Sequence, residues 1–498
     1  MTSFCKALLV ASIAVCVIPM AHADEWRALE TNGIQMTGNV SERTFRRVAE
    51  NVEAYKYLLK LSIPALNVTT PMKLRVLLLK QATFEKYLQP RDIVGGVGRE
   101  NLFSVDIAID ASGDALLSAT QTTLNQLTHF YLRKAADFVV PVWYEDGLSE
   151  LLSTVDVDGR IITMGKPPVG RWQHVQHLKW MPISEVVTVS RKALLSMPDH
   201  AVLSFAAESW LMLHFANIGD KKWLPATLKL VALADRGWSP NEALQKVFGP
   251  DLVAYERALK SYSRNSELGF ARFERPPVTT SVLALESLSE AEGLTRVALM
   301  MLRGHRDNGA IEKLLTPLAA DSNNLRAAAA LAYLLTTSNR RTAALPLIER
   351  CKSAQDAEAA LLCGRAILGP FMQGGGDESD ARSAARSSRE LFERAYQLDS
   401  REFEAIQANL TTYHILDDGQ AKLIPMLQDA LKVVPRSQAL HVDLSRAFAR
   451  EGRFADARSQ LERAILNSVA QEERDTLMRA LHDVENAEVT AESAKKTH

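Results

Sequence analysis

The C-terminal half of the chain repeats one helical pattern about every 34 residues, and this repeat constrains the fold more than any other feature. The unit with the clearest register is "ALHVDLSRAFAREGRFADARSQLERAILN". Small and large residues recur in it at helical spacing: Leu444, Ser445, Phe448, Gly452, Phe454, Ala457, Leu461 and Ala464. A helix pair of this kind cannot bury its apolar face alone, so neighbouring units must stack against one another.

Earlier copies of the unit precede this one. The positions in register with it are Leu410, Thr411, Leu427 and Ala430, then Leu331, Ala332, Leu335, Ala344, Ile348 and Cys351, and before them Ala298, Ala310 and Leu314. Another unit carries the inserted loop "FMQGGGDESD". The pattern resembles tetratricopeptide repeats, which implies about five units over 286–470 in an all-α superhelix with a concave face. We expect a C-terminal helix and polar tail over 471–498; an unrelated α-helical bundle is the alternative to the repeats.

The first residues, "MTSFCKALLVASIAVCVIPMAHADEW", have the layout of a secretory signal peptide over 1–23. Lys6 precedes an apolar run that ends at Met20, and an A-x-A site predicts cleavage after Ala23. The run is shorter than the roughly 20 residues that a membrane-spanning helix needs. Lipid attachment at Cys16 is a second alternative, which the bulky Val15 before it disfavours. We therefore expect an exported protein, periplasmic in a Gram-negative cell or secreted, with no membrane span.

The charge balance indicates which partners to expect, and the cysteine content indicates which disulfide can form. The 58 basic and 59 acidic residues nearly balance. No basic cluster is interleaved with aromatic residues, so we expect no nucleic-acid partner. Cys351 and Cys363 remain after signal cleavage; they could pair in an oxidising compartment or serve as two small buried apolar residues. Because Cys351 closes one repeat unit and Cys363 lies in the next, we predict a disulfide between adjacent helices.

The region between signal and repeats mixes strand and helix patterns. "MKLRVLLL" (72–79) predicts a buried strand, and "LFSVDIAID" (102–110) an edge or half-buried strand. A long helix is expected over about 114–135. This order predicts an α+β domain over 26–180 with a small sheet, followed by a helical subdomain over 181–265. The paired Pro276 and Pro277 mark a linker over 266–285 before the repeats.

Two stretches of this region, "TLNQLTHFYLR" and "PVWYEDGLSELLST" (141–154), have the pattern of a metal site. With "DGRIITMGKPPVGRW" and "ESWLMLHF", they resemble the gluzincin-like "peptidase MA" group over roughly residues 26–265. In that group the first stretch reads H-E-x-x-H and the second reads W-x-N-E-G-x-A-E, whose first glutamate is the third zinc ligand. The resemblance implies a gluzincin-like α+β domain with its helical subdomain, a domain that this group often couples to tetratricopeptide repeats.

Carried onto this chain, the zinc-ligand positions are Asn125, His129 and Asp146, and the general-base position is Gln126. Glu150 matches the carboxylate that steadies a ligand histidine. Catalytic zinc normally has three protein ligands and a water, and the amide of Asn125 is a poor donor for it. The amide of Gln126 cannot accept the proton that a general base must take near neutral pH. We therefore expect no catalytic residues, no metal and no cofactor at these vestigial positions.

Neighbouring residues give little prospect of rescuing the chemistry. Glu145 flanks Asp146 on the same predicted helix and does not replace Gln126. His214 lies on an otherwise apolar helix, where a hydrogen-bonded core histidine is the more common role. His174 and His177 have the i, i+3 spacing of metal ligands, but surface histidines often share this spacing.

The sequence thus predicts an exported pseudo-metallopeptidase that binds a protein or peptide through the repeat concave face and the degenerate cleft. Its role would be that of a binding or scaffolding factor in the cell envelope. The alternative is a residual zinc metallohydrolase of the gluzincin type that uses His129, Asp146 and a third ligand not evident from the sequence.

Overall fold

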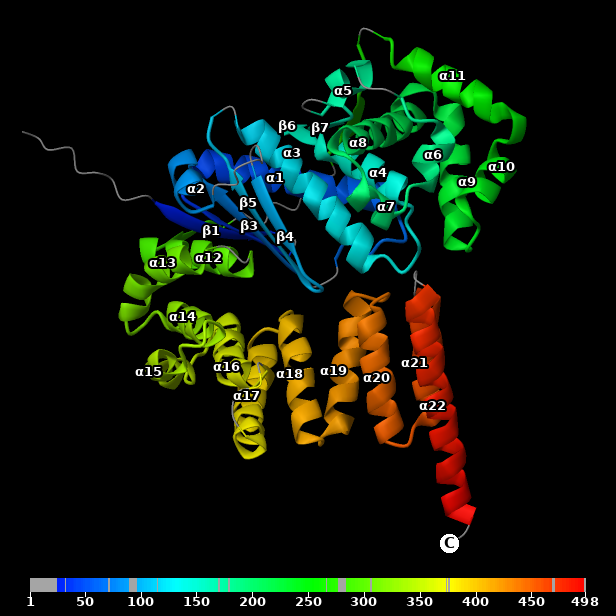
Figure 1. The fold of residues 1–498 in the computed structure, drawn as a ribbon. Helices are drawn as coiled ribbons and strands as arrows, with labels where there is room; N and C mark the ends of the chain where they lie inside the picture. The colour runs from blue at the N-terminus through cyan, green and yellow to red at the C-terminus, as the bar shows by residue number, and fades with distance from the viewer. Residues whose placement is uncertain are drawn as a thin grey trace, which may run out of the picture.

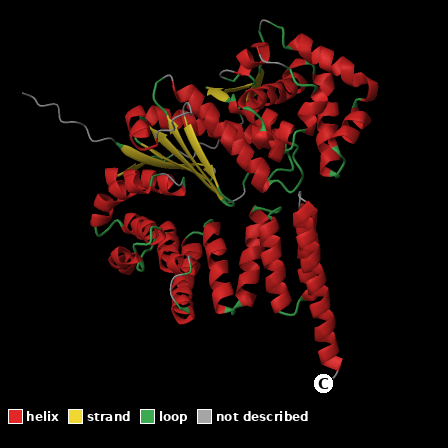
Figure 2. Cartoon of the chain, in the orientation of Figure 1, coloured by secondary structure: helices red, strands yellow, loops and turns green. Residues whose placement is uncertain are grey.

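A computed structural model describes residues 25–496, except 32, 70–71, 89–95, 114, 169–170, 178–179, 266, 276–283, 305–306, 373, 375–376 and 468–470. The predicted signal peptide with its cleavage site, and the paired Pro276 and Pro277, lie outside the described residues. Most of the described chain is helical, with a small mixed sheet near its N-terminus (Figure 2).

The main sheet has six strands in the order β4-β5-β3-β2-β1-β9. Their bounds are β1 Trp26–Thr31, β2 Ile34–Gly38, β3 Lys73–Leu79, β4 Gly96–Glu100, β5 Ser104–Asp110 and β9 Glu286–Leu288. β3 runs parallel to β2 and to β5, and the other pairs are antiparallel. The predicted strand at 72–79 is the central β3. The strand at 102–110 is β5, which is paired on both sides; β4 forms the edge.

Helices cover the sheet and carry the motif stretches (Figure 1). They are α1 Glu42–Ser62, α2 Gln81–Leu88, α3 Ala115–Phe130 with its π-helical extension Tyr131–Ala135, and α4 Val142–Ser153. The apolar stripe of α1 packs toward the core through Phe45, Val48 and Val52, because these positions recur at helical spacing. α3 and α4 pack directly on each other, which brings the two motif stretches together.

A mostly helical subdomain follows. Its elements are β6 Asp156–Asp158, β7 Ile161–Met164, α5 Arg171–His177, α6 Ile183–Thr188, α7 Arg191–Ser196, α8 Asp199–His214, α9 Leu224–Asp235, α10 Pro240–Val247, α11 Leu252–Tyr262 and β8 Ala271–Glu274. α8 lies so close to α4 that a Cβ at Gly147 would meet the Ser209 carbonyl oxygen at 2.3 Å. Of the described helices, the segment Asp199–Gly219 is long and apolar enough to cross a membrane, and 67% of its apolar window is buried inside the molecule.

The C-terminal half is a tetratricopeptide-like array of consecutive helix pairs (Figure 1). The pairs are α12 Glu290–Arg303 with α13 Asn308–Ala320, α14 Leu325–Thr337 with α15 Arg341–Cys351, α16 Ala357–Met372 with α17 Glu378–Leu398, α18 Phe403–Leu416 with α19 Gln420–Val433, and α20 Gln438–Arg450 with α21 Phe454–Asn467. A long final helix, α22 Gln471–Lys496, packs on α21. The inserted "FMQGGGDESD" begins in the last residues of α16 and ends in the first turn of α17, and residues 373 and 375–376 of it lie outside the described residues.

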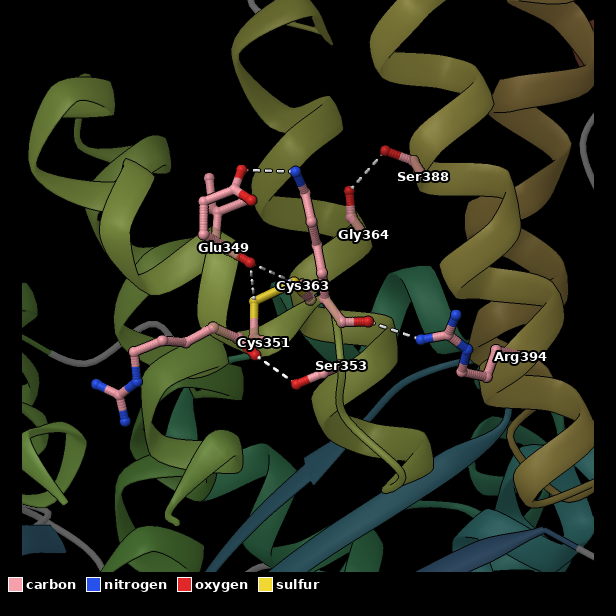
Figure 3. Close-up of a disulfide and its surroundings, with 10 residues drawn as sticks. Glu349, Cys351, Ser353, Cys363, Gly364, Ser388 and Arg394 are labelled. Atoms are coloured by element: carbon pink, nitrogen blue, oxygen red, sulfur yellow. Dashed lines mark hydrogen bonds and ion pairs between the residues drawn. A yellow bond between two sulfur atoms is a disulfide. The ribbon is translucent and has the colours of Figure 1, made fainter. Parts of the chain in front are cut away.

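The predicted disulfide is confirmed. Cys351 at the end of α15 and Cys363 on α16 are joined, with Cα atoms 5.8 Å apart (Figure 3). Both cysteines are fully buried, so the bridge lies within the repeat core. It ties one unit of the array to the next, as the positions of the cysteines in the repeat predicted.

The repeats fold back onto the sheet, which the sequence did not predict. β9, just after the predicted linker and at the start of the predicted repeat region, adds to the sheet beside β1, and Trp26 is opposite Leu288. A Cβ at Gly293 on α12 would lie 2.1 Å from the Trp26 ring, so this contact requires glycine. β8 uses part of the predicted linker and pairs with β7. The first helices of the early units therefore face the sheet of their own chain.

Buried polar contacts join the two regions at this junction. Glu404 of α18 accepts hydrogen bonds from Asn101 Nδ2 at 2.7 Å and Ser104 Oγ at 3.0 Å, both next to β5 or within it. Arg365 of α16 pairs with the same carboxylate at 3.1 Å. Burial alone would raise the pKa of Glu404, but the positive charge of Arg365 and the hydrogen bond from Asn101 help to hold it well below its usual range. Phe103 and Phe403 stack nearby, with ring centroids 5.5 Å apart.

Candidate functional site

Asn125 and His129 lie one turn apart on α3 and face α4, as their i, i+4 spacing predicts. Ser149 of α4 connects them. Asn125 Nδ2 donates to Ser149 Oγ at 3.2 Å, and His129 Nε2 lies 3.0 Å from the same hydroxyl. Ser149 Oγ is also 2.9 Å from the backbone carbonyl of Asp146, to which it can donate. His129 is thus held in a polar network between the two motif helices.

Glu145 contacts the other nitrogen of the His129 ring. His129 Nδ1 lies 2.6 Å from Glu145 Oε1, and Arg133 Nε donates to that oxygen at 2.6 Å. Arg191, from the distant helix α7, donates to Glu145 Oε2. Burial raises the pKa of Glu145, but the bond to His129 and the charges of His129, Arg133 and Arg191 together lower it to about 2. Glu145 is therefore a buried, permanently ionised carboxylate.

Asp146, the neighbouring carboxylate, behaves in the opposite way. Its Oδ1 lies 3.6 Å from His129 Nε2, beyond hydrogen-bond distance. Burial and the negative charge of Glu145 raise the pKa of Asp146 to about 6, against the attraction of His129 and the two arginines. Two adjacent carboxylates thus titrate in separate pH ranges because one is paired with arginine and the other is not.

The structure brings the predicted ligand positions Asn125, His129 and Asp146 together between α3 and α4. Gln126, at the general-base position, lies against the edge strand: a Cβ at Gly98 would be 3.1 Å from Gln126 Oε1. Glu150 does not contact His129; it pairs with Arg171 of α5 at 2.5 Å. The carboxylate that orients the histidine is Glu145 instead, because α4 turns Glu150 toward α5.

The donor atoms of His129, Glu145 and Asp146 lie within 4.8 Å of one another, the arrangement of a potential metal site among the described residues. The two carboxylates contact opposite nitrogens of one imidazole ring, Glu145 at Nδ1 and Asp146 near Nε2. A single ion bound to one ring nitrogen cannot reach both carboxylates with the roughly 2.0–2.2 Å bonds that zinc makes. Both oxygens of Glu145 are, moreover, already paired with guanidinium groups. The residues present do not fit a three-ligand zinc site.

Of the other three histidines considered from the sequence, His214 has structural hydrogen-bond partners. His214 is buried, donates from Nε2 to the Gly165 carbonyl at 2.7 Å, and its Nδ1 lies 2.9 Å from the Tyr262 hydroxyl. Burial lowers its pKa. His174 and His177 lie on the short helix α5. None of the three belongs to a three-residue metal cluster in the described part of the chain.

Sequence reasoning missed the arginine partners of Glu145. Arg133 follows His129 by four residues on the same helical segment, so a charge pair across to α4 could have been anticipated from spacing. Arg191 comes from a separate helix, 46 positions along the chain from Glu145, a contact that no local pattern encodes.

No protein-family model matches the chain, and no curated protein matches it. Among solved structures, it is similar to TTC0263, a thermophilic TPR protein in Thermus thermophilus, with 14% identity over 39% of this chain and 98% of that chain, at a TM-score of 0.28. It is also similar to MamA, with 18% identity over 33% of this chain and 91% of that chain, at a TM-score of 0.27. The tetratricopeptide-like description above depends on the helix pairs themselves.

Proposed function

We propose that the protein is an exported, non-catalytic pseudo-metallopeptidase that binds a protein or peptide partner and acts as a scaffolding factor in the cell envelope. One observation carries the proposal: the carboxylate beside His129 is neutralised by Arg133 and Arg191. We infer that the protein is exported because its N-terminal sequence has the layout of a signal peptide.

Arg133 and Arg191, which pair with Glu145, oppose metal binding in two ways. The two guanidinium groups supply positive charge beside the histidine, so a divalent cation entering there meets electrostatic repulsion. They also occupy the oxygens of Glu145 that a metal would need. Gln126 adds a chemical obstacle, since its amide cannot act as the general base that activates water. The scaffold of a peptidase is compatible with binding and incompatible with turnover.

Partner binding is supported by the tetratricopeptide-like array, because such arrays form extended binding surfaces. The early units have their first helices turned toward the sheet, which leaves less of this face open. A cavity of 290 Å³ lies along α14, α16 and α18. Its lining includes Tyr333, Leu368, Met372 and Thr411. We propose this open part of the repeat face as the place where an extended peptide segment first docks.

The test of the pseudoenzyme is to restore the ligands. We expect wild-type protein to bind no stoichiometric zinc, and Asn125→His with Asp146→Glu to bind it, because His129 Nε2 already faces position 146. Glu145 would then orient the histidine from its other nitrogen, as second-shell carboxylates do. Hydrolysis of a peptide substrate should need Gln126→Glu in addition. Zinc titration of folded variants decides this; a triple variant that binds no more tightly than wild type would refute our placement of the cleft.

A residual zinc metallohydrolase is the second candidate, and the 3.6 Å approach of Asp146 Oδ1 to His129 Nε2 is what favours it. Metal analysis of the purified exported protein separates the two. One zinc per chain, lost in His129→Ala and retained in the surface control His482→Ala, together with hydrolysis of a peptide substrate by wild-type protein, would establish the hydrolase candidate. Absence of zinc together with retained partner binding in His129→Ala would establish the pseudoenzyme.

A further inference from the structure

A polar cavity of 410 Å³ lies between the sheet and the first repeats, away from the His129 network. Strands β2 and β3 line one wall with Gln35, Thr37 and Arg75, and the repeats line the other. Its walls carry six basic side chains and four acidic ones. Because both regions contribute, a molecule bound here would touch the sheet and the repeats at once.

Five of the six basic groups already have partners. Lys73, Arg75, Arg303, Arg326 and Arg401 each lie within ion-pair distance of at least one carboxylate, for example Arg303 at 2.9 Å from Asp106. The charges of these five side chains are thus compensated within the folded protein, so they give no reason to expect a ligand. The cavity would be an ordinary charged junction if the sixth group were paired too.

Arg296 of α12 is the exception. No carboxylate oxygen of the described residues lies within 4.0 Å of it, and its Nε is buried without a hydrogen-bond partner. The charges that act on it from farther away include Asp356, Glu292 and Glu286, and also the repulsive Arg326. Burial, and then Arg326, lower the pKa of Arg296. A half-buried guanidinium without an acceptor costs stability unless something supplies one.

We infer that this cavity binds a small molecule bearing an oxyanion, a carboxylate or a phosphate, through the guanidinium group of Arg296. Guanidinium groups recognise both anions through paired N–H donors, which gives strong and oriented hydrogen bonds. Gln35 and Thr37 on the opposite wall provide polar side chains for the rest of the molecule. The volume of 410 Å³ suits a small metabolite. This site is independent of the vestigial peptidase cleft.

The test is calorimetric titration of the full mature chain with inorganic phosphate and, separately, succinate, in a low-salt buffer that contains neither. Arg296→Gln removes the unpaired charge without breaking an ion pair, so the variant should fold and lose at least tenfold in affinity. Arg296→Lys should retain part of the binding. Arg340→Gln is the matched control, since Arg340 pairs with Glu312 at an exposed position outside the cavity lining.

The two anions distinguish the chemical class of the ligand. Saturable binding of either one, weakened in Arg296→Gln and unchanged in Arg340→Gln, supports the site, and the tighter anion identifies the class as phosphate or carboxylate. Saturable binding of neither anion overturns the inference. Binding that persists at wild-type strength in Arg296→Gln overturns it as well.

Discussion

The His129 network and the cavity around Arg296 are both half-buried clusters of charge, but they differ in how completely the charges are paired. In the first, each oxygen of Glu145 has an arginine partner. In the second, five basic groups are paired and Arg296 is not. The comparison teaches that a network with paired charges can be explained by folding alone, whereas a charge without a partner that faces a cavity is a candidate for ligand binding.

Breaking the paired part of the sheet–repeat junction should have the largest effect. Glu404→Ala leaves Asn101, Ser104 and Arg365 without their shared acceptor. We expect a loss of about 3–5 kcal/mol in the free energy of unfolding, the usual cost of breaking a buried charged network. Urea denaturation measures it. Glu349→Ala, an exposed partner of Lys352, is the control and should change stability by less than about 0.5 kcal/mol.

Opening the disulfide should have the next largest effect and should reach the Arg296 cavity. Cys351 and Cys363 are 12 residues apart, and the intervening segment includes the cavity-lining residues Asp356 and Glu358. Replacing both cysteines with serine should cost about 3 kcal/mol through the freed loop. It should also weaken anion binding, since the wall of the cavity loosens. Thermal unfolding and titration measure the two effects, and unreduced wild-type protein should show no free thiols.

The next prediction compares the His129 network directly with the Arg296 cavity. Glu145→Ala removes the acceptor shared by His129, Arg133 and Arg191. The expected loss is about 2 kcal/mol, less than at the junction because both arginines reach solvent. By contrast, Arg296→Gln should leave the stability of the unliganded protein unchanged or slightly raised, because it removes a half-buried charge that has no acceptor. Equal losses in the two variants would contradict the distinction between closed and open clusters.

The last expected effect is confined to one pH window and comes from Asp146. Its pKa is raised to about 6 in the folded protein, from an ordinary value of 3.8. The folded state therefore holds the proton to higher pH, and stability is lost as pH rises from about 4 through 6, by up to about 3 kcal/mol for the full shift. Asp146→Asn should flatten this window when unfolding is measured at each pH. The pKa of Glu145, about 2, places its own transition below the window.

Local patterns predicted the features that depend on nearby residues. The repeat register anticipated the helix pairs and the contact of Cys351 with Cys363, and the apolar run at 72–79 anticipated the central strand β3. The H-E-x-x-H comparison placed Asn125, His129 and Asp146 together, because helical spacing fixes which side chains share a face. Contacts between distant segments were not predictable: Arg191 reaches Glu145, and β9 joins β1, through tertiary packing that leaves no periodic trace in the sequence.

The pairing of β9 with β1 has a consequence for how this protein can be divided. The first strand after the linker, β9, completes the sheet of the N-terminal region, so the repeat half supplies a piece of the other half. A chain cut within 276–283 should remain associated, with the repeat fragment held by strand pairing and by the Trp26–Gly293 contact. Repeats produced without the first 265 residues would lack their partner strand. Gene fusions that exchange either half should therefore fail unless they carry the complementary strand with them.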